Sequence, residues 1–350
     1  MKEQAILKNS KVLVTGGAGF IGSNLCEQLL EQGNQVRCLD NLSTGMRSNL
    51  EHLMEHPSFQ FIEGDIRDYK TCEQSTEGIE YVLHQAALGS VPRSLKDPMT
   101  TTDVNIGGFV NMLFASVQAK VKRFVYAASS STYGDHPDLP KQEHIIGNPL
   151  SPYAITKYVD ELFAKNFSAS YGIETVGLRY FNVFGRRQSP NGAYAAVIPK
   201  FVIQLINHES PVINGDGSYS RDFTYIDNVL HANQVACLAS SDQLKAARLE
   251  YYQQHGLKPE ELDVISEVIN VAFGGRTNLV ELVNYLKTNL AKYDPEISEV
   301  EIKFGPNRAG DIPHSQASIE KGKMLFGYDP QYSVEEGLKI AVDWYWKNLK

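Results

Sequence analysis

Short runs of apolar residues recur along the first half of the chain, each followed by a segment long enough to form a helix. The run at 11–15 is apolar without alternation and ends at glycines, as strands buried on both faces of a parallel sheet do. Similar runs lie at 35–39, 59–62, 81–84, 123–127 and 175–178. Strands that alternate with helices build βαβ units, so the pattern predicts an α/β protein with a Rossmann-type, doubly wound parallel sheet.

The regular alternation weakens after Tyr180, and Gly, Pro and Asn become frequent between 184 and 217. The length of 350 residues is consistent with about two domains of roughly 150 residues each. We therefore expect a Rossmann domain at 1–180 and a smaller α/β domain at 181–350, with an interleaved boundary. The polar stretch 240–261 predicts a helix and a loop, and it indicates no chemistry of its own.

Composition and charge narrow the classes of partner. A net charge of -8 disfavours nucleic acid and anionic membranes, because both repel an acidic protein that has no basic patch. No run of about 18 apolar residues is present, and the first ten residues lack the apolar core of a secretion signal, so we expect a cytoplasmic protein. The four cysteines are scattered without C-x-x-C spacing, which predicts buried thiols and no metal site.

A glycine-rich segment, T-G-G-A-G-F-I-G at 15–22, follows the first strand and opens the first helix. It fits both G-x-G-x-x-G and the wider G-x-x-G-x-x-G spacing. Glycines allow the backbone to approach a pyrophosphate, and the N-terminus of a helix attracts anions. Asp40 ends the second strand about 20 residues later, where a carboxylate accepts hydrogen bonds from an adenosine ribose. This combination predicts a dinucleotide site and favours NAD over NADP, whereas a glycine-rich turn alone could lack a ligand.

A tyrosine and a lysine follow a helix-start signal, Ser151-Pro152, further along the chain. Tyr153 and Lys157 stand at i and i+4, so one helix face presents a phenol beside an ammonium group. The positive charge favours the phenolate, which makes Tyr153 a candidate base. The spacing alone is common on exposed helix faces, and its weight comes from the preceding glycine segment.

Ser129 is the third candidate, at the end of the strand predicted at 123–127. Carboxyl ends of strands border the ligand crevice in such sheets, so its hydroxyl could bind a reacting oxygen. Taken by itself, the segment 128–134 is more typical of a Ser/Thr-rich turn.

Together these motifs resemble the extended short-chain dehydrogenase/reductase superfamily from about residue 11 to the C-terminus. The segments 64–68, 84–87, 179–185 and 221–223 are similar to those of its sugar-nucleotide epimerases and dehydratases. The segments 87–94 and 191–199 resemble most closely the bacterial UDP-N-acetylglucosamine 4-epimerase group. The resemblance implies a homodimer formed through the helices at 101–119 and 152–170, and a role in polysaccharide biosynthesis.

The resemblance also implies which residues form the site. Those expected around NAD are Gly16, Gly19, Phe20, Ile21, Gly22, Asp40, Asn41, Asp65, Ile66, Ala86, Asn105, Tyr153, Lys157 and Tyr180. Those expected around the UDP group are Asn182, Ala196, Val197, Asn214, Arg221, Arg308 and Asp311. Those expected around the sugar are Gly89, Ser90, Ser130, Ser131, Gln188 and Ser315. Ser315 matches a gatekeeper position, where a small side chain leaves space for an N-acetyl group.

The resulting hypothesis is reversible 4-epimerisation of UDP-N-acetylhexosamines through a 4-keto sugar. Tyr153 would act as base with Lys157 beside it, Ser129 would bind the 4-oxygen, and NAD would stay tightly bound. UDP-glucose and UDP-uronate epimerases and a decarboxylase remain open alternatives. A 4,6-dehydratase is disfavoured because Ser130 and Ser131 stand where that class carries an acidic pair, and a non-catalytic NAD sensor is disfavoured by the intact Ser129, Tyr153 and Lys157.

Overall fold

The computed structural model describes residues 6–190, 196–258, 264–306 and 313–349. Its centre is a seven-stranded sheet in the order β11-β6-β5-β4-β1-β2-β3, and all neighbouring strands are parallel. The strands are β1 (Lys11–Thr15), β2 (Gln35–Asp40), β3 (Phe59–Glu63), β4 (Tyr81–His84), β5 (Arg123–Ser129), β6 (Glu174–Tyr180) and β11 (Ser266–Val271). The Rossmann-type sheet and its six predicted strands are confirmed, and the seventh strand comes from beyond residue 180.

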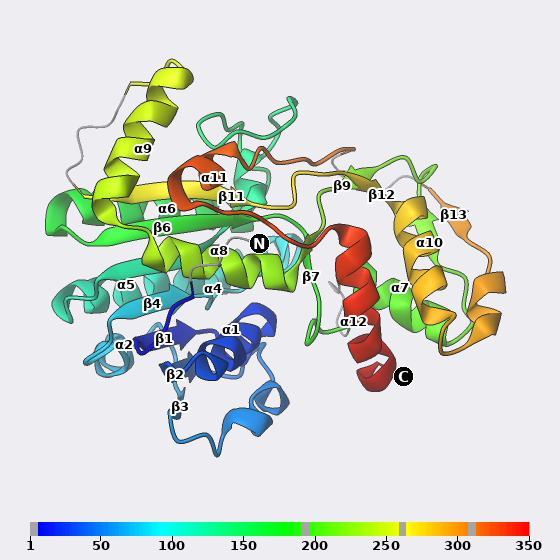
Figure 1. Ribbon diagram of the computed structural model, residues 1–350, viewed down its shortest axis with the longest axis horizontal. Helices are drawn as coiled ribbons and strands as arrows, with labels where there is room; N and C mark the ends of the chain where they lie inside the picture. The colour runs from blue at the N-terminus through cyan, green and yellow to red at the C-terminus, as the bar shows by residue number, and fades with distance from the viewer. Residues whose placement is uncertain (1–5, 191–195, 259–263, 307–312, 350) are drawn as a thin grey trace.

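Helices cover both faces of the sheet (Figure 1). On β1, Val12 and Val14 point into one core while Leu13 points into the other, as the alternation of side chains along a strand requires. The first core contains α1 (Phe20–Glu31) and α8 (Ile226–Leu238). The second contains α2 (Tyr69–Thr76), α5 (Gly108–Gln118) and α6 (Pro152–Tyr171).

Shorter elements complete this part of the chain. The helices α3 (Val91–Lys96) and α4 (Pro98–Thr102) pack against α6, and a π-helical turn, η3 (Asp103–Gly107), leads into α5. Short 3-10 turns occur at η1 (Arg47–Asn49), η2 (Glu51–Leu53) and η4 (Ser130–Tyr133). Within the predicted helix-and-loop stretch, α9 (Ser241–Gln254) is a helix that packs on α11 (Glu320–Phe326). Among the described residues, no helix is long and apolar enough to cross a membrane.

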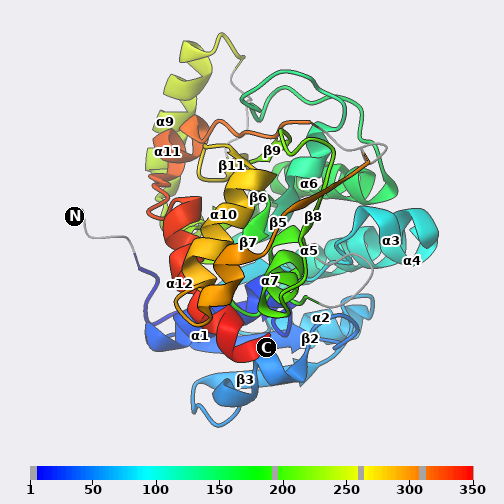
Figure 2. The same cartoon turned by 90° about the vertical axis from the view of Figure 1, so that its right-hand side faces the viewer.

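The rest of the second half forms a smaller lobe, at the right of Figure 1. Its helices α7 (Val197–Ile206), α10 (Leu279–Leu290) and α12 (Val334–Asn348) pack against one another, as Figure 2 shows. Three two-stranded sheets pair β7 (Val183–Phe184) with β10 (Thr224–Tyr225), β8 (Val212–Asn214) with β13 (Lys303–Gly305), and β9 (Ser220–Arg221) with β12 (Thr277–Asn278). The lobe shares the α1–α8 core, so its position relative to the sheet is fixed by apolar packing.

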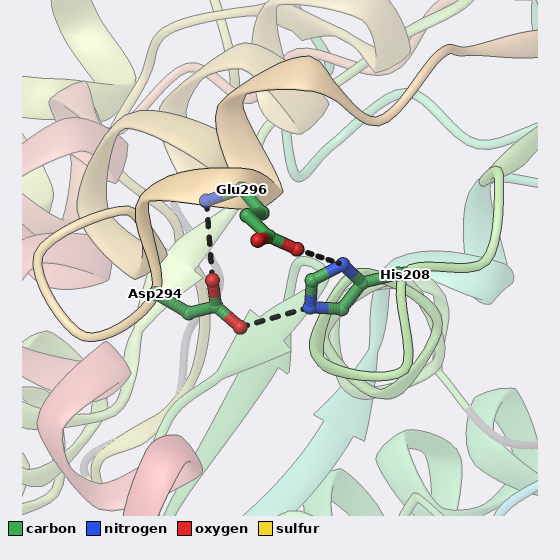
Figure 3. A group of neighbouring side chains, drawn as sticks. All are labelled: His208, Asp294 and Glu296. Carbon is green, nitrogen blue, oxygen red and sulfur yellow. Dashed lines mark hydrogen bonds and ion pairs between the residues drawn. The ribbon is translucent and has the colours of Figure 1, made fainter.

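A histidine and two carboxylates join two parts of this lobe (Figure 3). His208 lies just after α7, and its Nε2 is 2.8 Å from Asp294 Oδ2, while its Nδ1 is 3.7 Å from Glu296 Oε2. The two acids belong to the start of η5 (Pro295–Glu299). All three are metal-binding residue types, and one ligand atom from each lies within 4.8 Å of the others, but each carboxylate is already paired with a different nitrogen of the ring. We interpret the group as an ion-pair link between α7 and η5.

Candidate active site

Gly16 and Gly22, at the turn between β1 and α1, have no space for a side chain. A Cβ atom on Gly22 would lie 2.2 Å from the carbonyl oxygen of Gly16, and one on Gly16 would lie 2.7 Å from the nitrogen of Ala86. Gly16 also has a φ of +67°, in the left-handed region that favours glycine. Gly19 precedes α1 without a side-chain cap, so the first N–H groups of the helix are available to an anion.

Asp40 lies at the carboxyl end of β2, beside this turn. Its Oδ2 accepts a hydrogen bond from the N–H of Ala18 at 2.9 Å, and its Oδ1 accepts one from the N–H of Leu42 at 2.8 Å. Burial raises the pKa of the Asp40 carboxyl, and the two N–H donors oppose that effect. The backbone therefore fixes the orientation of this carboxylate relative to the glycine turn.

A cavity of about 490 Å³ lies over the carboxyl ends of the central strands. The predicted residues in its walls are Gly16, Gly19, Phe20, Ile21, Gly22, Asp40, Asn41, Ile66, Ala86, Gly89, Ser129, Tyr153, Lys157, Tyr180 and Asn182. We call it the cofactor cavity, because a glycine cradle that excludes Cβ atoms and an oriented acid at the end of β2 fit a dinucleotide. Its walls also contain Gln85, Ala87 and Leu88, which lie in the family-like segments 84–87 and 87–94 but were not predicted as site residues, and Arg187, which lies outside those segments.

The candidate catalytic residues reach this cavity from two elements. Ser151 caps α6 by accepting a hydrogen bond from the N–H of Ala154 at 3.1 Å, which confirms the predicted helix start. One turn of helix separates Tyr153 from Lys157, whose Nζ donates to the carbonyl of Ala127 at 2.9 Å and lies 3.2 Å from Asp160 Oδ2. Ser129 ends β5, so strand and helix together bring a hydroxyl, a phenol and an ammonium group to one cavity.

The hydroxyl of Ser129 is oriented by its neighbour. Its Oγ accepts hydrogen bonds from Ser131, from the backbone N–H at 3.2 Å and from the hydroxyl at 2.8 Å. The proton of Ser129 therefore remains available to an oxygen in the cavity. Ser130 and Ser131 do not appear in the cavity walls and instead form the η4 turn that supports Ser129.

Tyr180 is held by two amide side chains. Its hydroxyl donates to Gln85 Oε1 at 3.0 Å and accepts from Asn233 Nδ2 at 3.0 Å. Burial raises the pKa of the Tyr180 phenol, so it remains protonated at neutral pH. It is a wall of the cofactor cavity and not a second base.

A second cavity of about 300 Å³ shares Asn182 and Val183 with the first. We call it the substrate cavity. Its walls contain six residues predicted around the substrate, namely Asn182, Gln188, Ala196, Val197, Asn214 and Arg221. Phe184, Tyr219, Phe223 and Leu279 add apolar and aromatic surface; Phe184 and Phe223 lie in the family-like segments 179–185 and 221–223, but none of the four was predicted as a site residue. The guanidinium of Arg221 donates to the carbonyls of Ser220 at 3.0 Å and Pro313 at 3.2 Å, which orients the cation.

Some predicted site residues lie behind these walls. Asn105 accepts from the N–H of Leu88 at 2.7 Å and donates to Thr156 Oγ1 at 3.1 Å, so it ties a wall segment to α6. Asp65 binds Arg67 at 2.7 Å and Asn41 at 2.9 Å, and these contacts, with that to Arg67 first, lower the pKa of Asp65 to about 2.

Four further predicted residues, Ser90, Ser315, Arg308 and Asp311, are not among the described residues that border either cavity. Ser90 caps α3 by accepting from the N–H of Arg93 at 3.1 Å. Ser315 donates its N–H to the carbonyl of Ser220 at 3.0 Å, beside Arg221, without appearing in either cavity wall. Arg308 and Asp311 lie outside the described residues.

The NAD dependent epimerase/dehydratase family matches residues 12–247. The structure of the UDP-N-acetylglucosamine 4-epimerase of Methanobrevibacter ruminantium, in complex with UDP-N-acetylmuramic acid, is similar with a TM-score of 0.85 and 35% identity over 97% of this chain and 99% of that one. The UDP-glucose 4-epimerase of Thermotoga maritima with UDP-glucose is similar with a TM-score of 0.83 and 34% identity over 98% and 100%. The UDP-glucuronate 4-epimerase of Thermodesulfobacterium geofontis is 32% identical over 97% of each chain.

Proposed function

Because the chain belongs to the NAD-dependent epimerase/dehydratase family, we propose that it interconverts UDP-N-acetylglucosamine and UDP-N-acetylgalactosamine by inversion at carbon 4. The observation that carries the proposal is the meeting of Ser129, Tyr153 and Lys157 with the glycine turn in one cavity, next to a second cavity that Arg221 borders. The family uses NAD, and sugar-nucleotide 4-epimerases are among the proteins with which the chain aligns from end to end.

The residues of the chain divide the reaction between them. The glycine turn and Asp40 would hold NAD, which would supply reversible hydride transfer at carbon 4 of the sugar. The Tyr153 phenolate takes the proton of the 4-hydroxyl group as carbon 4 becomes a ketone, and it gives the proton back when the hydroxyl is restored. Lys157 favours the phenolate by its charge, and Ser129 donates a hydrogen bond to the 4-oxygen.

The UDP group must stay bound while the 4-keto sugar rotates to present its other face. Asn182, Asn214 and Arg221 border the substrate cavity, and an oriented guanidinium is suited to a diphosphate. The family resemblance also assigns Arg308 to the UDP group, but that residue lies outside the described part of the chain. This arrangement explains how an acidic chain, with a net charge of -8, can bind a dianion through a few local cations.

We base the choice of an N-acetylated sugar on Ser315. Its N–H donates to the carbonyl of Ser220, and the next residue, Arg221, borders the substrate cavity, which supports this choice. A serine leaves more space than an aromatic side chain would, so an acetamido group fits the proposal. UDP-glucose and UDP-glucuronate remain the alternatives, because epimerases for both are similar to this chain at closely comparable identity.

The test uses the purified enzyme and four UDP-sugars: UDP-N-acetylglucosamine, UDP-N-acetylgalactosamine, UDP-glucose and UDP-glucuronate. We expect turnover without added NAD, release of NAD on denaturation, and the highest kcat/KM on the two acetylated sugars. Tyr153→Phe should lower kcat by about three orders of magnitude with UDP affinity unchanged, because a general base typically contributes 10²–10⁴-fold, roughly. Undiminished epimerisation by this variant would refute the assigned base, and a preference for UDP-glucuronate would refute the assigned substrate.

A further inference from the structure

Asp160 is a buried acid directly behind the candidate catalytic pair. It lies on α6, three residues after Lys157, and its side chain is 0% exposed while that of Lys157 is 3% exposed. Its Oδ2 lies 3.2 Å from Lys157 Nζ, and its Oδ1 has no hydrogen-bond partner among the described residues. Asp160 borders neither of the two cavities. A buried carboxyl group with one unpartnered oxygen lowers the free energy of unfolding. Packing alone therefore does not explain why an acid occupies this position.

The position of the lysine ammonium depends on two acceptors. Nζ donates to the carbonyl of Ala127 at 2.9 Å and to Asp160 at 3.2 Å. An ammonium group has three N–H bonds, so one remains for the cavity that Lys157 borders. Ala127 belongs to β5 and Asp160 to α6, and together they hold the cation between strand and helix.

The other charged groups around Asp160 have partners or are neutral. On α6, Glu161 forms two hydrogen bonds of 2.8 Å with Arg179 of β6. On β4, burial and then the charge of Lys157 lower the pKa of His84 to about 3, so its ring is uncharged at neutral pH. On β5, burial raises the pKa of the Tyr126 phenol far above neutrality. Among Asp160, Glu161, His84 and Tyr126, Asp160 is therefore the residue whose charge changes near neutral pH beside Lys157.

We propose that Asp160 is a positioning residue for Tyr153 and Lys157: it fixes the lysine ammonium and sets how strongly the lysine charge acts on the tyrosine hydroxyl. The proposal rests on the proposed function, in which Tyr153 is the base. An ionised Asp160 offsets the positive charge of Lys157, whereas a protonated Asp160 leaves that charge unopposed.

The balance between these two states of Asp160 shifts near neutral pH. Burial raises the pKa of Asp160 to about 7, opposed by the charge and hydrogen bond of Lys157 and reinforced by the charge of Glu161. Asp160 is therefore ionised above about neutral pH, where it weakens the effect of Lys157 on Tyr153. Asp160→Asn keeps an acceptor for Nζ and removes the charge, so it should lower the pKa of Tyr153.

The experiment is a pH titration of the phenolate absorbance of Tyr153 in the purified holoenzyme. Tyr153→Phe is made in both the wild-type and the Asp160→Asn background, so that each difference spectrum isolates Tyr153. We expect the midpoint to fall by about one pH unit in Asp160→Asn, the size of a nearby charge at an effective dielectric of about 20. The acid limb of the kcat profile should move in the same direction.

A second variant separates charge from geometry. Asp160→Ala removes both the charge and the acceptor, so kcat should fall about tenfold at every pH, and asparagine at the same position should restore it. If Asp160→Asn does not fold, the titration of Tyr153 is measured in Asp160→Ala, which also lacks the charge. Glu143→Gln is the matched control, because Glu143 is also a buried acid whose pKa is raised by burial, and among the described residues one of its oxygens has no hydrogen-bond partner and no hydrogen bond joins it to Lys157. The titration midpoint of Tyr153 in Glu143→Gln should equal that in the wild type.

Two results are distinguishable. An unchanged Tyr153 midpoint in a folded, charge-neutral variant overturns the role of Asp160, even if Tyr153→Phe is inactive. Full turnover by Tyr153→Phe instead overturns the proposed function, whatever the titration shows.

Discussion

The carboxylate of Asp222 joins three segments that are distant in sequence. It is 1% exposed and accepts hydrogen bonds from the N–H groups of Phe273 at 3.2 Å, Gly274 at 3.1 Å and Ala317 at 3.1 Å. Its neighbours Arg221 and Phe223 border the substrate cavity. The shape of that cavity therefore depends on a residue that does not itself border it.

Asp222→Asn should destabilise the protein by about 2–4 kcal/mol. One carboxylate oxygen becomes an NH₂ group that faces backbone donors, so buried N–H groups lose their acceptor. Urea denaturation measures the loss. Asp216→Asn is the control, since that acid bonds Ser218 within one exposed turn, and its stability should stay within about 0.5 kcal/mol of the wild type. Equal stability of the two variants would contradict the assigned role.

Roles of this kind limit what sequence can predict about the site. The sequence predicted Ser129, Tyr153 and Lys157 as a group, because two lie one helical turn apart and the third ends a strand. The contacts of Asp222 span 51 and 95 residues of chain, and those of Gln85 with Tyr180 span 95. No local spacing encodes such contacts. Asp160 was missed for another reason, since an acid on a helix usually faces solvent and only the packing of α6 shows it to be buried.

At the scale of elements, the packing of α1 on the glycine turn determines the cofactor cavity. The turn follows β1, and α1 begins within van der Waals distance of it because Gly22 has no Cβ atom. The same arrangement directs the N-terminus of α1 to the cavity. Helix position and anion binding therefore depend on the same glycine.

Gly22→Ala should displace α1 and weaken NAD binding. The new methyl group would lie 2.2 Å from the carbonyl oxygen of Gly16 and 2.7 Å from the Cα atom of Gly17, both backbone atoms that cannot move alone. We expect a loss of about 1–3 kcal/mol in stability, as in overpacked cores, together with less NAD released per chain on denaturation.

The matched control is Gly107→Ala, also within a helical segment. Gly107 has a φ of -59°, and its added Cβ would meet Asp103 Oδ1 at an ordinary 3.6 Å. NAD content should be unchanged and stability equal or up to about 1 kcal/mol higher, because alanine restricts the unfolded chain. Full NAD content in Gly22→Ala would show that the turn tolerates a side chain.

The elements themselves were predictable where their pattern is local. Six strands were predicted from their apolar runs and the first helix from the spacing of its apolar residues. Both patterns arise because strands and helices that pack against each other bury apolar side chains. The seventh strand, β11, was not predicted. It follows α9 and pairs with β6 about 90 residues earlier, in the register Val268 with Gly177, and its own sequence does not identify its neighbour. The division at 1–180 and 181–350 stays a prediction, with β11 and α8 as the elements that return from the second part to the sheet.

At the scale of the whole molecule, exposed apolar side chains gather on three helices that pack together. Leu95 on α3 is 64% exposed, Met99 on α4 is 80%, and Ile155 and Leu162 on α6 are 49% and 50%. The helices α3 and α4 pack against each other and against α6, so these exposed side chains lie on neighbouring helices, and we refer to them together as the α3–α4–α6 face. Adjacent exposed apolar residues are typical of subunit interfaces. We propose that this face binds a second copy of the chain, in line with the homodimer expected from the sequence.

Leu162→Glu should therefore convert a dimer to a monomer. A two-fold interface contains each residue twice, so the variant buries two carboxylates in an apolar contact, at a cost of several kcal/mol. Light scattering should give the mass of one chain, 39.0 kDa, for the variant and twice that mass for the wild type. Leu249→Glu is the control, because Leu249 is similarly exposed, at 45%, but lies on α9 outside this face. A wild type of single-chain mass would refute the interface, and a dimer that persists in Leu162→Glu but not in Leu249→Glu would move it to α9.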